Sequence, residues 1–158
     1  MDRFKKIMVP VDGKRGTYEC VRLACHIGKQ NNSDIFLVYA INLSNINTVA
    51  RFYNDQGEKI INENIKVAEA CFHRFISNIK LESTYDFKFT TRVVKGKNVD
   101  ELLIDFAQNN MIDLIIMSLT PKKSALDIVM GNILLRVVEF SKVPVLVLPA
   151  VADTEETK

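Results

Sequence analysis

Two short, continuously apolar runs, Leu114–Met117 and Val143–Leu148, predict buried β-strands in the last third of the chain. Between them, apolar residues at 133, 134, 137 and 138 recur at helical spacing. Strands that are apolar on both faces and joined by a helix are typical of a parallel βαβ unit, because helices cover both faces of a parallel sheet. We therefore expect a right-handed crossover here, with the polar loop 119–124 following the first strand.

The rest of the chain continues this alternation. Thr17 is expected to cap the first helix, and Asn98 with Glu101 to begin a later one as a capping box. Residues 42–57 show no clear period and predict a long loop that is either a lid or disordered. The remaining elements are predicted strands at 5–12, 34–41 and 87–94, the last half-exposed at a sheet edge, and helices at 17–30, 58–80 and 98–109.

Strands and helices that alternate in this way predict a doubly wound α/β fold with two helices on each face of the sheet. The length of 158 residues fits one domain, which we place at 1–150, with a polar tail at 151–158. Pro10 falls near the end of the first strand, where a missing backbone hydrogen bond is more easily tolerated.

Composition excludes several classes of protein. The net charge of +2 is too small to indicate nucleic-acid binding by itself. No apolar run approaches the roughly 20 residues that span a bilayer, and the N-terminus lacks the apolar core of a signal peptide. The three cysteines are an odd number without metal-ligand spacing. We therefore expect a cytoplasmic protein with buried, reduced thiols and no insertion into membranes.

Ligands of open α/β sheets bind at the carboxyl ends of the strands, where the direction of the connections reverses. The loops after Asp12 and Met117 would line that crevice together if their strands are neighbours. Asp12 then either caps the turn into the first helix or contacts a ligand. His26 and His73 lie at neither metal-ligand spacing nor a strand end, so we expect no metal site, no catalytic triad and no enzymatic activity.

The sequence resembles the universal stress protein family from about Phe4 to Leu148. The stretches that carry the resemblance are Lys6–Gly13, Val94–Gly96, Asp113–Met117 and Val143–Val147. The resemblance implies a doubly wound five-stranded parallel sheet with strand order 3-2-1-4-5 and helices on both faces. It also implies a homodimer in which the last strand, within residues 143–149, pairs with that of its partner.

ATP-binding members of the family carry the motif G-x2-G-x9-G-[ST] after the fourth strand, and this chain departs from it. Ser118 and Pro121 stand at the first two glycines, Gly131 retains the third, and Asn132 stands at the Ser/Thr position. Glycine lets the backbone approach phosphates, and Pro121 lacks an N–H donor. Gly131 and Asn132 either begin a helix that still offers an anion-binding N-terminus or begin one without a ligand.

Other positions match the family's site. Asp12 stands where the strand-one aspartate contacts the nucleoside, and Ala40 where strand two faces adenine. Lys122 and Lys123 either supply charge to phosphates or are solvated loop residues. The resemblance thus implies an intact adenosine half and an eroded phosphate half. The candidate nucleotide-binding residues are Pro10, Val11, Asp12, Ala40, Ser118, Pro121, Lys122, Gly131, Asn132 and Ile133.

Two functions follow from the resemblance. The first is a non-catalytic stress-response or regulatory protein that acts as a dimer through protein contacts, with weak or no ATP binding. The second is a sensor that binds ATP or another adenine nucleotide, with slow or no hydrolysis. The departures at Ser118 and Pro121 favour the first, and the retained Asp12 and Gly131 favour the second.

Overall fold

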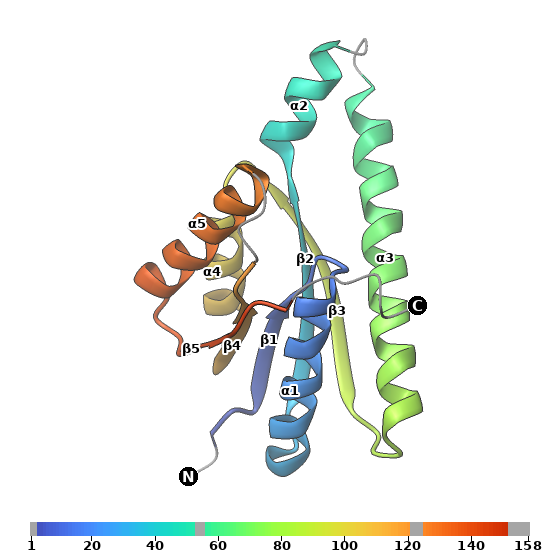
Figure 1. Ribbon diagram of the computed structural model, residues 1–158, viewed down its shortest axis with the longest axis vertical. Coiled ribbons are helices and arrows are strands. Elements are labelled where there is room, and N and C mark those ends of the chain that lie inside the picture. Colours follow the sequence, from blue (N-terminus) through green and yellow to red (C-terminus); the bar gives the residue numbers. More distant parts are fainter. Residues whose placement is uncertain (1–2, 53–55, 121–124, 152–158) are drawn as a thin grey trace.

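The computed structural model describes residues 3–52, 56–120 and 125–151, with the backbone alone described at 49–52 and 125–131. Strands and helices alternate along this part of the chain, except that α2 and α3 follow one another (Figure 1). Their bounds are β1 (Lys6–Pro10), α1 (Arg15–Asn31), β2 (Asp34–Asn42), α2 (Leu43–Phe52), α3 (Gly57–Glu82), β3 (Lys88–Gly96), α4 (Val99–Asn109), β4 (Leu114–Ser118), α5 (Ala125–Phe140) and β5 (Val145–Leu148).

The strands form one parallel sheet in the order β3-β2-β1-β4-β5, which confirms the expected order and the half-exposed edge position of β3. Neighbouring residues of β1 point to opposite faces of the sheet. Ile7 and Ile116 belong to a buried cluster with α1 and α3, whereas Met8 and Ile115 belong to a second cluster with α4 and α5. The expected pair of helices on each face is therefore confirmed. Among the described residues, no helix combines the length and apolar character needed to cross a bilayer.

The central strands β1 and β4 separate toward their carboxyl ends. Their register ends at Met8↔Ile115, whereas β1 pairs with β2 along its whole length. Successive N–H groups of a parallel strand point alternately to its two neighbours, and the Val11 N–H donates to the Val38 oxygen on β2 at 2.9 Å. Pro10 therefore faces β4, where it has no N–H to donate. The missing bond leaves room for a crevice between the strand ends.

The prediction of a loop at 42–57 is wrong, because most of this stretch is the helix α2. Asn42, the last residue of β2, caps it: its Oδ1 accepts hydrogen bonds from the N–H groups of Ser44 at 2.9 Å and Asn45 at 3.4 Å. Ile46 is buried, and α2 contacts α3. Both helices extend beyond the sheet at the carboxyl end of β2 (Figure 1). Residues 53–55 lie outside the described residues.

Two helix starts and one cap also differ from expectation. α1 begins at Arg15, because the Thr17 hydroxyl bonds Asp12 rather than capping the helix. Asn98 precedes α4 as predicted, but its side chain donates to the Glu101 carboxylate and accepts no hydrogen bond from a backbone N–H of the helix. α5 begins at Ala125, so the prediction that Gly131 and Asn132 begin this helix is wrong. Residues 125–130 contain neither glycine nor proline, and a single glycine inside a helix costs only about 1 kcal/mol.

The three cysteines are free thiols buried in the cluster under α1 and α3. Burial raises the pKa of Cys20 and of Cys25 to about 12, and that of Cys71 to about 11, from an ordinary value of 9.0. A nearby carboxylate adds to each shift, because it disfavours a second negative charge. The thiols therefore stay protonated and serve as small apolar side chains.

The free energy of unfolding is expected to fall as the pH rises above about 9. In the unfolded chain the thiols lose their protons near their ordinary pKa, whereas the folded thiols keep theirs, so proton release stabilises the unfolded chain. Urea midpoints at about pH 8 and about pH 10 measure the slope. Cys25→Ala removes one of the shifted groups and should reduce it. Equal pH slopes in the wild type and the Cys25→Ala variant would contradict this account.

Candidate functional site

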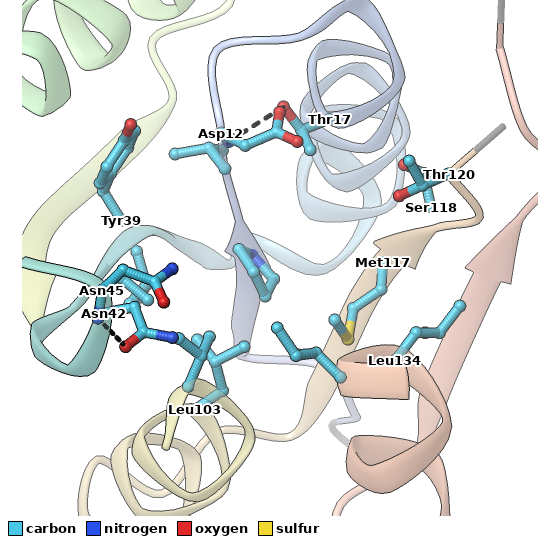
Figure 2. Close-up of a pocket in the computed structure, with 16 residues that line it drawn as sticks. Asp12, Thr17, Tyr39, Asn42, Asn45, Leu103, Met117, Ser118, Thr120 and Leu134 are labelled. Atoms are coloured by element: carbon cyan, nitrogen blue, oxygen red, sulfur yellow. Dashed lines mark hydrogen bonds between the residues drawn. The ribbon is translucent and has the colours of Figure 1, made fainter. Parts of the chain in front are cut away.

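A pocket of about 260 Å³ lies at the carboxyl ends of β1, β2 and β4, in the crevice where β1 and β4 separate. Figure 2 shows Asp12 and Thr17 at the top of it, Asn42 and Asn45 on the left, and Met117 and Leu134 on the right. The lining residues are Pro10, Val11, Asp12, Thr17, Val38, Tyr39, Ala40, Asn42, Asn45, Val99, Leu103, Met117, Ser118, Thr120, Ile133 and Leu134.

The structure brings together six of the ten candidate residues. They come from β1, β2, β4 and α5, and are Pro10, Val11, Asp12, Ala40, Ser118 and Ile133. Gly131 and Asn132 both lie inside α5, and Asn132 does not line the pocket. Asn132 is exposed to solvent. Pro121, Lys122 and Lys123 lie outside the described residues.

Asp12 has both a structural partner and a free oxygen. Its Oδ1 accepts hydrogen bonds from the Lys14 N–H at 2.8 Å and from the Thr17 hydroxyl at 2.9 Å (Figure 2). These bonds form an Asx turn that leads β1 into α1. Among the described residues, none donates a hydrogen bond to the other carboxylate oxygen, Oδ2. The turn role foreseen for Asp12 is therefore present, and one acceptor remains for a ligand.

An arginine on α3 stabilises the turn that follows Asp12. Gly13 has φ +84°, a conformation that side chains with a Cβ rarely adopt. The Arg74 guanidinium donates to the Gly13 oxygen at 2.7 Å, and it also lies over the Phe75 ring at 5.4 Å. The position of Asp12 thus depends on a glycine in the turn and on an arginine from another element.

Ser118 lies at the end of the pocket away from Asn42 and Asn45, next to the first turn of α1. A Cβ on Gly16 would lie 2.9 Å from the Ser118 hydroxyl oxygen, so the first turn of α1 approaches this side chain closely. Beyond it lies a small adjoining cavity of about 20 Å³, which Lys14 and Thr120 also line. That volume is close to the space that one water molecule needs.

The described lining of the pocket carries one charged side chain. Among the described lining residues, Asp12 is the only one that is charged at neutral pH, and none is a lysine or arginine. The walls are mainly apolar, with Val99 and Leu103 from α4 facing Val38 and Ala40 from β2. In the described part of the chain, no group of three or more His, Cys, Asp or Glu side chains is arranged to hold a metal ion.

Sequence reasoning missed the residues that α2 contributes. Asn42 and Asn45 line the pocket because α2 begins directly at the end of β2. A signal was present in the sequence, since asparagine directly after an apolar run is a favoured N-cap. Tyr39 was missed as well. Its pKa is raised chiefly by burial, with smaller contributions from Cys71 and Asp12, so its hydroxyl stays protonated.

Two solved structures share this fold and hold adenine nucleotides. A universal stress protein in complex with cAMP aligns with a TM-score of 0.62 and 17% identity, over 93% of this chain and 98% of that one. The universal stress protein from Archaeoglobus fulgidus in complex with dAMP aligns with a TM-score of 0.64 and 15% identity, over 93% and 98%. At these identities the likeness shows the fold.

Family membership comes from the sequence. The chain is 24% identical to the universal stress protein MJ0531 of Methanocaldococcus jannaschii over 153 residues, which cover 91% of this chain and 81% of that protein. The model of the universal stress protein family matches residues 3–149, nearly the whole chain. The chain therefore belongs to the universal stress protein family.

Proposed function

We propose that the protein is a cytoplasmic, non-catalytic regulator that acts as a homodimer and binds the nucleoside part of an adenine nucleotide. In this proposal the phosphates add little affinity and ATP is not hydrolysed. The observation that carries it is the Oδ2 of Asp12, to which no described residue donates a hydrogen bond, in a pocket with mainly apolar walls. A carboxylate oxygen accepts hydrogen bonds from ribose hydroxyls, and it repels a phosphate.

The size of the pocket supports a nucleoside. Its 260 Å³ is slightly below the roughly 300–1,000 Å³ of sites for drug-sized ligands. Apolar walls from Val38, Ala40, Val99 and Leu103 suit the faces of a flat base. The cAMP and dAMP complexes of other universal stress proteins support an adenine nucleotide with one phosphate.

An ATP sensor with slow hydrolysis is the second candidate, and Lys14 favours it. Lys14 lines the small cavity beyond Ser118, on the side where phosphates would have to extend. That cavity is about 20 Å³, too small for a phosphate group unless the surrounding residues move. Asp12 also lines it, and its charge opposes an anion there. These observations favour the nucleoside over the triphosphate.

Calorimetry with adenosine, AMP and ATP tests the proposal. We expect the phosphates to contribute less than about 0.7 kcal/mol to the binding free energy. The three dissociation constants should therefore agree within about threefold. Phosphate release from ATP should not exceed that of buffer. ATP binding more than about tenfold tighter than AMP would favour the second candidate. No binding of any of the three ligands would reject both.

The homodimer is proposed from the surface around β5. This strand lies at the edge of the sheet, and Leu146 and Val147 on it are 39% and 36% exposed. The preceding helix α5 also exposes large apolar side chains, with Leu135 at 65% and Phe140 at 61%. An apolar edge strand favours pairing with another chain. Pairing with a second copy about a twofold axis would cover it with one symmetric contact.

A further inference from the structure

We propose that Asn42 and Asn45 select adenine over other purines by reading the edge of the base. The inference rests on the proposed nucleoside site and assigns base recognition to the end of β2 and the start of α2. Both side chains line the pocket, at the end away from Ser118 (Figure 2). With the ribose at Asp12, the base extends along the apolar walls toward these two amides.

The orientation of the Asn42 amide is fixed by the cap of α2. Its Oδ1 accepts hydrogen bonds from the N–H groups of Ser44 and Asn45, at 2.9 and 3.4 Å. Rotating the amide by half a turn would direct its NH₂ group at those N–H donors and break the cap. Asn42 therefore presents only its Nδ2 group to the pocket, as a hydrogen-bond donor (Figure 2).

Asn45 supplies the complementary group. It occupies the third position of α2, where a longer side chain could reach back to the N-cap backbone in a capping box. No hydrogen bond of its side chain occurs among the described residues. Its amide extends from α2 into the pocket (Figure 2), and it is free to turn its Oδ1 toward a ligand.

This arrangement matches adenine. The fixed donor of Asn42 pairs with the ring nitrogen N1, an acceptor, and Oδ1 of Asn45 accepts from the adjacent amino group. In protein–DNA complexes a single asparagine recognises adenine by an analogous pair of bonds, with its NH₂ group donating to N7 and its oxygen accepting from the amino group. In hypoxanthine N1 carries a hydrogen, so two donors would face each other at Asn42. Because the cap prevents Asn42 from turning over, the mismatch cannot be relieved.

Adenosine and inosine are the probes, since they differ only at this edge of the base. The wild type is expected to bind adenosine about tenfold more tightly than inosine, the effect of one lost and one opposed hydrogen bond. Asn42→Asp keeps the cap, because aspartate is an equally good N-cap, and it replaces the donor with an acceptor. This variant should reverse the preference, and Asn45→Leu should weaken adenosine binding about three- to tenfold.

Asn47→Asp is the matched control, because Asn47 is exposed on α2 and does not line the pocket. It should leave the ratio of the two dissociation constants unchanged. Circular dichroism melts establish that every variant is folded. Adenosine binding with an unchanged ratio in Asn42→Asp would overturn the inference and leave the nucleoside site standing. Failure of the wild type to bind adenosine would overturn both.

Discussion

Leu146→Lys is expected to convert the protein from a dimer into a monomer at micromolar concentration. In a twofold pairing of two β5 edges, the substituted lysine would lie close to its own copy in the partner. Two like charges brought together in an interface cost several kcal/mol, so the dissociation constant should rise at least about 100-fold. Sedimentation velocity of the wild type and the variant measures the change.

Leu81→Lys is the control for this experiment. Leu81 lies near the end of α3, far along the chain from β5, and is 86% exposed. The same change of leucine to lysine there should leave the association state unaltered. A wild type that sediments as a monomer, or a Leu146→Lys variant that remains a dimer, would contradict pairing through β5.

Asp12→Asn is expected to weaken adenosine and AMP binding by about 10- to 100-fold. The substituted side chain keeps one oxygen, which can still accept from the Lys14 N–H and the Thr17 hydroxyl. It replaces the free carboxylate oxygen with an NH₂ group that cannot accept from ribose. A hydrogen bond to a charged group contributes about 1.5–3 kcal/mol, which sets the expected range.

Asp12→Ala provides the comparison, because it removes the turn as well as the ligand contact. It should lower the melting temperature, whereas Asp12→Asn should leave it nearly unchanged. Calorimetry at matched ionic strength gives the affinities, and thermal unfolding gives the stabilities. If Asp12→Asn binds adenosine as tightly as the wild type, Asp12 has only its structural role in the turn.

The sheet could be predicted from the sequence because its strands are short apolar runs with clear ends. In the apolar run at 35–40 residues 35–38 are buried, and the run at 114–117 is buried throughout, which is the pattern of central parallel strands with both faces covered. The order of the strands came from the family resemblance. α2 was missed because its apolar residues show no clear helical period in the sequence, and among its residues whose side chains are described only Ile46 is buried.

The site was predictable where it depends on the ends of strands. Asp12 and Ser118 directly follow apolar runs, so their meeting follows from the neighbouring positions of β1 and β4. The start of α5 was wrongly predicted at Gly131, because matching a motif aligns residues along the sequence but does not show where a helix begins. Asn42 and Asn45 were missed because the apolar pattern did not predict α2, although an asparagine directly after an apolar run was a signal for the N-cap of a helix.

The early separation of β1 and β4 also affects how the protein responds to heat. On one side of that boundary, β1, β2 and β3 share extended registers, and on the other side are β4 and β5. The pocket is lined from both sides of this boundary. Asp12 and Ala40 belong to the side of β1, β2 and β3, whereas Ser118 is on β4 and Leu134 is on α5, which connects β4 to β5. If the proposed nucleoside binds there, it would connect the two parts beyond the last residues at which β1 and β4 pair, and we expect it to raise the melting temperature of both together.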